Sequence, residues 1–144
     1  MYNTRIFSIL LFSLLLAACS SPDSELIDDN LPLNDQIDQL IDANEYEAAL
    51  NRLSAEDRND PEVLRLYEKT HLNYALHSMN TFDQTEMRTR MNNALHHFTE
   101  VLRINPENIV AREQIEQILT IYQTIPNRSP DPEIMEGLRE FGYE

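Results

Sequence analysis

The sequence contains little glycine, a single cysteine and no tryptophan. Two glycines in 144 residues are too few for a turn-rich all-β protein or for a glycine-rich phosphate loop. The single cysteine excludes a disulfide within the chain. Basic residues are also scarce: 11 Lys and Arg face 25 Asp and Glu, for a net charge of −14. Because phosphate binding requires clustered Lys and Arg, this balance argues against nucleic acid and anionic membrane surfaces as partners.

The remaining composition is that of a folded domain. The length suits one domain, and 42% of the residues are hydrophobic against 25% charged, which provides enough apolar material for a core. The acidic excess is most simply a solubility feature, and attraction to a basic partner surface is the alternative interpretation.

The first 18 residues have the layout of an export signal. Arg5 is followed by an apolar run over residues 6–16 and then by small residues. As a helix this run reaches only about 16 Å, at about 1.5 Å per residue. A bilayer core of about 30 Å requires about 20 residues, so the run is too short to remain as a transmembrane helix.

The small residues end at the only cysteine. The segment Leu16-Ala17-Ala18-Cys19 resembles the lipobox of bacterial lipoproteins. The resemblance implies that Cys19 receives a diacylglyceryl group and that residues 1–18 are removed as a signal peptide. Two or three acyl chains would then hold the protein stably to a membrane. An ordinary export signal with an incidental cysteine is the alternative.

The residues after the cysteine predict a location and a tether. In Gram-negative lipoproteins an Asp after the lipidated cysteine tends to retain the protein in the inner membrane. This chain has Ser20 there, so the resemblance favours the outer membrane, facing the periplasm, if the host is Gram-negative. Residues 19–33 are rich in Ser, Pro and acids without sustained periodicity, which predicts a flexible acidic tether. Residues 34–144 would form the folded domain.

That folded part has helical periodicity throughout. Apolar residues recur at spacings of three and four in five segments, and no segment alternates like a strand. The sequence therefore predicts an all-α domain of adjacent antiparallel helices. The apolar stripes are Ile37, Leu40 and Ile41; Tyr46, Ala49, Leu50 and Leu53; Leu64, Tyr67, His71 and Tyr74; Met87, Met91, Ala94, Leu95, Phe98, Val101 and Leu102; and Val110, Ile115, Ile118, Leu119 and Tyr122.

Polar residues followed by proline mark the expected helix starts, because they offer an N-cap and then the first helical position. These pairs are Asp60-Pro61, Asn105-Pro106 and Asp131-Pro132. We also expect Thr81 or Asp83 to cap a helix that begins near Gln84, and Gly142 to end the last helix.

Two segments of the domain resemble each other when they are aligned on their final prolines. Residues 44–61 and 89–106 then place Ala49 over Ala94, Leu50 over Leu95 and Leu53 over Phe98. The shared pattern resembles the second helix of a tetratricopeptide repeat, whose consensus runs Gly-Asp-Tyr-x-x-Ala-hydrophobic and ends near Asp-Pro. The matching stretches are Asn44-Glu45-Tyr46, Ala49-Leu50, Asn59-Asp60-Pro61 and Ile104-Asn105-Pro106.

This resemblance implies about two and a half tetratricopeptide-like helical hairpins over residues 30–124. The family period is about 34 residues, whereas Pro61 and Pro106 are 45 residues apart, so the second unit carries about 11 extra residues. We expect both of its helices to be lengthened, with a hinge near residues 80–83. We further expect a short helix over residues 132–140 to cap the open side of the third unit.

Two sets of residues stand apart from the family pattern. Ile37 and His71 occupy positions where the first helix of the family usually carries a small residue. Met79, Met87 and Met91 cluster around the insertion. We expect these methionines in the core, and an adaptable binding surface is the alternative.

Tetratricopeptide arrays bind proteins and peptides on a concave face that is lined by the first helix of each unit. The implied partner-binding face consists of Asp38, Ile41, Asp42, Arg65, Glu68, Leu72, Glu113 and Gln117. Its mixed acidic and apolar character suits a basic or amphipathic peptide. The implied function is a scaffold that holds an unidentified envelope protein at the membrane. The alternative is a structural subunit that self-associates into a homo-oligomer to cover its open side.

The chain offers no constellation for catalysis. It has no Gly-x-Ser-x-Gly, P-loop or His-Glu-x-x-His motif, so the sequence predicts neither an enzyme nor a cofactor. His96 and His97 point about 100° apart on a helix, and His71 and His77 lack the four-residue spacing of a helical metal pair. A periplasmic metal site would therefore need His71 or His77 to meet His96 or His97 across two helices. We expect the histidines to have structural roles instead.

Overall fold

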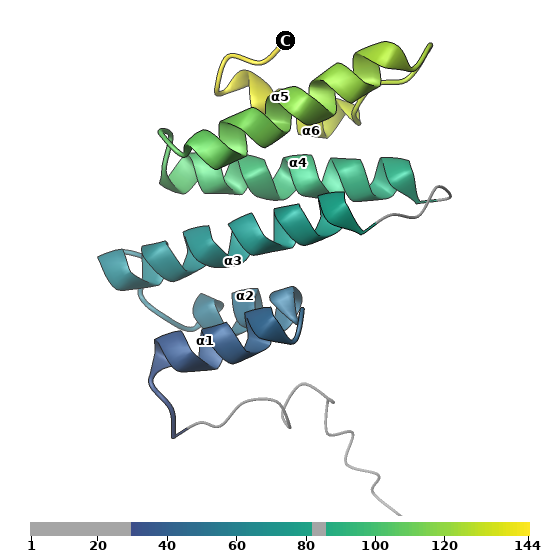
Figure 1. Cartoon of the computed structure of the whole chain (residues 1–144). Coiled ribbons are helices and arrows are strands. Elements are labelled where there is room, and N and C mark those ends of the chain that lie inside the picture. The colour runs from purple at the N-terminus through teal and green to yellow at the C-terminus, as the bar shows by residue number, and fades with distance from the viewer. Residues whose placement is uncertain (1–29, 82–85) are drawn as a thin grey trace, which may run out of the picture.

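The computed structural model describes residues 30–81 and 86–144. Within these ranges the chain forms six α-helices and no strand (Figure 1), which confirms the prediction of an all-α protein. In Figure 1 helices α1 to α5 follow one another in chain order from one end to the other, and α6 packs against α4. None of these six helices is sufficiently long and apolar to cross a membrane. Their bounds are α1 Leu33–Asp42, α2 Tyr46–Ser54, α3 Pro61–Asn80, α4 Met87–Ile104, α5 Ile109–Thr124 and α6 Pro132–Arg139.

The central pair of helices is much longer than the first pair. α3 has 20 residues and α4 has 18, whereas α1 has 10 and α2 has 9, as the wide spacing of Pro61 and Pro106 predicts. In Figure 1 the far ends of α3 and α4 project beyond α1 and α2. α3 ends at Asn80, within the expected hinge, of which residues 82 and 83 lie outside the described residues.

The helix starts agree with the prediction at two prolines and disagree at one. Pro132 is the first residue of α6 and follows Asp131, although the Asp131 side chain makes no cap hydrogen bond. The Asp60 carboxylate accepts a hydrogen bond of 2.8 Å from the Glu62 N–H, and Pro61 is the first residue of α3. The prediction for Asn105-Pro106 is wrong, because α5 begins three residues after the proline, at Ile109. Asn108 is its N-cap, and its side chain accepts from the Ala111 N–H at 2.9 Å.

The prediction for the start of α4 is also wrong in part. The Thr81 hydroxyl donates to the His77 carbonyl at 2.7 Å, so Thr81 closes α3 instead of opening the next helix. α4 begins at Met87 after Glu86, which makes no side-chain cap hydrogen bond. The predicted cap Asp83 and the predicted start Gln84 lie outside the described residues.

The core consists of two clusters of buried apolar side chains, and α3 contributes to both. The N-terminal cluster lies among α1, α2 and the first half of α3, and the C-terminal cluster lies among α3, α4, α5 and α6. The N-terminal cluster is Ile37, Leu40, Ile41, Tyr46, Ala49, Leu53, Val63, Leu66 and Tyr67. The C-terminal cluster is Ala75, Ala94, Leu95, Phe98, Val101, Leu102, Ala111, Ile115, Ile118, Tyr122 and Leu138.

The last helix covers part of the C-terminal cluster. Leu138 of α6 is fully buried there, and α6 packs mainly against α4. The chain then turns at Gly142, whose φ of 88° lies in the left-handed region that favours glycine. At the start of α5, Ile109 and Val110 remain 69% and 43% exposed. The expected short helix is therefore present, but it packs mainly against α4 and leaves the beginning of α5 exposed.

Candidate functional site

The eight residues of the predicted partner face fall into two groups in the structure. Asp42, Arg65, Glu113 and Gln117 are exposed, whereas Asp38, Glu68 and Leu72 are half-buried and Ile41 is buried. Ile41 belongs to the N-terminal cluster, and Leu72 packs against the C-terminal cluster. These two side chains therefore serve the core more than a partner surface.

Two of the half-buried acids join neighbouring helices. The Lys69 ammonium lies 2.5 Å from the Asp38 carboxylate, which links α3 to α1. Glu68 accepts hydrogen bonds from the side-chain amides of Asn105 and Asn108 at 2.9 and 2.8 Å. This carboxylate therefore ties α3 to the turn that leads into α5, and both acids have structural roles.

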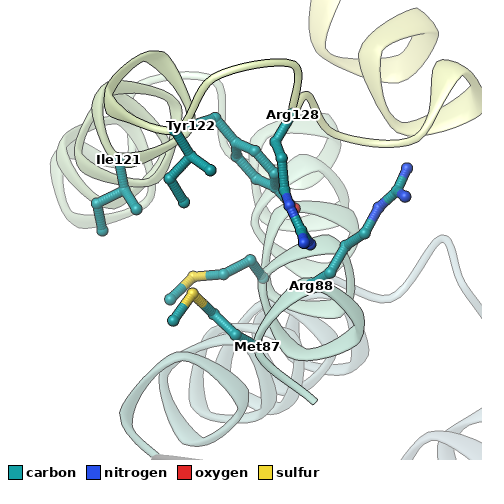
Figure 2. A pocket seen from close by; sticks show the side chains of 7 residues that line it. Met87, Arg88, Ile121, Tyr122 and Arg128 are labelled. Carbon is teal, nitrogen blue, oxygen red and sulfur yellow. The ribbon is translucent and has the colours of Figure 1, made fainter. Parts of the chain in front are cut away.

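A cleft lies between the beginning of α4 and the end of α5 (Figure 2). It has a volume of about 290 Å³. Met87 stands on the α4 side of the cleft and Ile121 on the α5 side, with the Tyr122 ring between them at the back. The residues that line it are Met87, Arg88, Met91, Ile121, Tyr122, Ile125 and Arg128. The walls are thus largely apolar, and both cations lie at one end.

A network of hydrogen bonds holds the closed end of this cleft. The Asp131 carboxylate binds Arg88 Nη2 at 2.6 Å and the side-chain amide of Asn92 at 2.7 Å. The Asn92 side-chain oxygen accepts from the Tyr122 hydroxyl at 3.4 Å and from the Asp131 N–H at 3.2 Å. Burial raises the pKa of Tyr122, and the charges of Arg88 and Arg128 oppose this rise. These contacts come from α4, α5 and the N-cap of α6, and together they fix the position of Arg88.

Arg128 differs from Arg88 in having no carboxylate partner among the described residues. Arg88 pairs with Asp131, whereas Arg128 forms no ion pair within residues 30–81 and 86–144 and is exposed. Two guanidinium groups line this end of the cleft, with Asp131 paired to Arg88, and Glu144 lines an adjacent pocket together with Arg128 without forming an ion pair with it. The charged side chains that line the cleft itself are therefore both cationic, in a chain whose net charge is −14.

Protein-family models, curated proteins and solved structures give no match to this chain. The candidate site is accordingly defined by geometry alone.

The sequence signalled this cleft only weakly. Met87 and Met91 belong to the methionine group for which we expected a core position, and both are half-buried on the cleft wall. Met79 packs against the C-terminal cluster. Neither Arg88 nor Arg128 stands out in the sequence, because their proximity depends on how the end of α5 meets the start of α4.

A second constellation lies deeper, between α3 and α4. His71 and His97 place their Nδ1 atoms 2.9 Å apart, and their side chains are 8% and 4% exposed. Tyr74 stacks on His97 with ring centroids 4.0 Å apart, and Tyr46 stacks on Tyr74 at 4.9 Å. The structure thus forms one of the cross-helix histidine pairs that a metal site would need.

The chemistry of this pair is that of a buried hydrogen bond. Burial lowers the pKa of His71 to about 4 and that of His97 to about 3, so both rings are neutral at pH 7. One Nδ1–H then donates to the Nδ1 of the other ring. Tetrahedral zinc with bonds of about 2.0–2.1 Å would separate the two nitrogens by about 3.3 Å, which is longer than the 2.9 Å between the Nδ1 atoms of His71 and His97. No group of three His, Cys, Asp or Glu side chains in the described part of the chain is arranged to hold a metal.

Proposed function

We propose that this chain is a lipid-anchored adaptor of the bacterial cell envelope, with a tetratricopeptide-like helical domain that binds a segment of a partner protein. In this proposal Cys19 is lipidated, residues 1–18 are removed, and residues 19–33 tether the domain to the membrane. If the host is Gram-negative, the anchor lies in the outer membrane and the domain faces the periplasm. The protein acts as a scaffold and carries out no reaction.

The observation that carries this proposal is the continuity of the outer face of α5. Glu113, Gln117 and Ile121 follow one another at four-residue steps, so they share one side of the helix. Glu113 and Gln117 are exposed members of the predicted partner face, and Ile121 lines the α4–α5 cleft. A polar strip that leads into an apolar cleft is a surface on which an extended or helical segment can lie.

The order of the helices gives further support. α1 packs with α2 and α3 packs with α4, and α5 follows beyond α4 in Figure 1, while α6 packs against α4. The contacts of Asp38 with Lys69 and of Glu68 with Asn108 connect α1 to α3 and α3 to the N-terminus of α5. Such nearest-neighbour contacts are the way in which helical repeats build extended binding surfaces.

The test is crosslinking of the tagged, full-length protein in its host membrane. We expect one or a few envelope proteins to be enriched, and Gln117→Arg combined with Ile121→Asp to remove them, because these changes alter the α5 face without touching the core. Gln39→Arg combined with Asn51→Asp is the matched control, since both of these residues are exposed on other helices. Enrichment that is the same in both double variants and in the parent would contradict the proposed surface.

A further inference from the structure

The α4–α5 cleft has a cationic end and apolar walls, an arrangement that the sequence did not predict. Arg88 and Arg128 stand at one end, and the side chains of Met87, Met91 and Ile121 form the walls. Charges farther away than the Debye length of about 8 Å at physiological ionic strength are largely screened. An incoming group at this end therefore meets the two guanidinium groups, Asp131 and, in the adjacent pocket, Glu144, whereas the more distant acids of this chain act on it only weakly.

The binding capacity of the two arginines is unequal. Asp131 occupies Nη2 of Arg88 and is itself held by Asn92, so this carboxylate is already fixed. Arg128 forms no ion pair with any residue of 30–81 and 86–144, so its guanidinium group offers a planar fork of donors suited to a carboxylate. This guanidinium group, with the remaining donors of Arg88 close by, specifies an anionic group of the ligand.

The size and walls of the cleft specify the rest of the ligand. Its volume of about 290 Å³ is at the lower limit of ligand pockets, which are about 300–1,000 Å³. It is therefore suited to one or two bulky apolar side chains and is small for a cofactor. Methionine walls adapt to apolar groups of different shapes.

We propose that the α4–α5 cleft binds an amphipathic segment of a partner protein that places a bulky apolar side chain between Met91 and Ile121 and an adjacent carboxylate against Arg128. This inference deepens the proposed function and rests on it. The cleft opens along α5 toward Gln117 and Glu113, about 12 Å away at 1.5 Å per residue. A peptide can extend along this strip, with its basic end toward Glu113, whereas a free acyl chain would leave the polar residues without a partner.

A peptide selection tests this proposal with the full-length, anchored protein in detergent micelles. A displayed library of random 12-residue peptides (about three helical turns) is selected on the parent protein. We expect the binders to share an Asp or Glu next to Phe, Leu, Ile or Met. In the Arg128→Glu variant we expect affinity for these peptides to fall about tenfold, which corresponds to the loss of one charge-assisted contact. A new selection on this variant should then favour Lys or Arg at the same place.

Two matched controls separate the cleft from general surface effects. Arg139→Glu changes another exposed arginine that has no carboxylate partner in the described ranges, and it should leave binding unchanged. Ile121→Asn should weaken binding, whereas Ile109→Asn, at the exposed other end of the same helix, should not.

Several outcomes would overturn the proposal. These are the absence of any binder, binders without a shared acid, or equal losses in the Arg128→Glu and Arg139→Glu variants. Displacement of the peptides by dodecanoate with the same dependence on Arg128 would assign the cleft to a fatty acid instead. If envelope crosslinking persists in Arg128→Glu while the selection fails, the adaptor function stands and only the assignment of this cleft is wrong.

Discussion

His71 and His97 illustrate how burial determines chemistry at the scale of single residues. His71 lies along α3 between Tyr67 of the N-terminal cluster and Ala75 of the C-terminal cluster. Burial is the largest influence that lowers the pKa of both histidines, and the nearby Glu100 carboxylate opposes the effect at His71. The pair is thus a polar contact between two apolar clusters, and it is stable only while at least one ring is unprotonated.

A pH-dependent stability follows from this arrangement. The two pKa values are lower in the folded protein than the ordinary 6.5, so the unfolded chain binds protons first. Stability is complete above about pH 6.5 and falls as the pH decreases toward about 4. The lowering at His71 alone predicts a loss of roughly 3 kcal/mol in the free energy of unfolding, which urea unfolding at a series of pH values measures.

Variants distinguish this loss from the titration of carboxylates. Replacement of both buried histidines by asparagine keeps a hydrogen-bonding pair that does not titrate, and it should flatten the profile between pH 6.5 and 4. His96→Asn, at an exposed position on the same helix, should retain most of the parent profile, because burial lowers the two pKa values more than the His96 charge does. Superimposable profiles for the parent and the double asparagine variant would show that the pair does not control this stability.

The sequence could indicate that His71 is unusual but could not find its partner. A histidine at a position that is usually small in the resembling family suggests a special contact across the helix interface. Which of the other three histidines it meets depends on the axial offset of α3 and α4, and their connection includes residues 82–85, outside the described range. The same reason applies to Arg88 and Arg128, which are 40 residues apart in the sequence and converge only in the folded chain.

The helix starts show what local sequence determines at the scale of elements. Asp60 was predictable because it directly precedes Pro61, the first residue of α3, and its side chain makes the cap hydrogen bond. Near α5 the two asparagines Asn105 and Asn108 are both good caps. Asn108 makes the cap contact while Glu68 binds the side-chain amides of both, so a tertiary contact contributes to the choice.

Asn108 therefore contributes to stability in two ways. Asn108→Ala removes the cap at Ala111 and one hydrogen bond to Glu68, and we expect a destabilisation of about 1–2 kcal/mol. Asn108→Asp retains a cap acceptor but sets a second carboxylate against Glu68, so we expect it to be less stable than the parent at neutral pH. Asn51→Ala, exposed on α2, should change the free energy of unfolding by less than about 0.5 kcal/mol. Thermal and urea unfolding would contradict the dual role if Asn108→Ala matched this control.

At the scale of the whole molecule, the sequence predicts the all-α class and the lengthened central hairpin, because both follow from periodicity and from the spacing of prolines. The binding face is harder to predict, because burial and internal contacts remove several of its expected members. Ile41 packs in the core, and Asp38 and Glu68 join helices. The remaining exposed residues connect along α5 to a cleft that becomes visible only in three dimensions.

In the proposed function the position of the domain in the cell depends on a lipid anchor at Cys19, a residue that lies outside the described residues. If the lipobox functions, Cys19→Ser should abolish incorporation of an alkyne-labelled palmitate and leave the signal uncleaved, because the serine hydroxyl cannot replace the thiol as acceptor. Ser21→Ala is the matched control, since it changes a neighbouring small residue and should retain the label. Mass spectrometry of the mature N-terminus provides a second measurement. A mature chain that is cut elsewhere and carries an unmodified thiol would support the ordinary export signal, and the domain would then act without a membrane anchor.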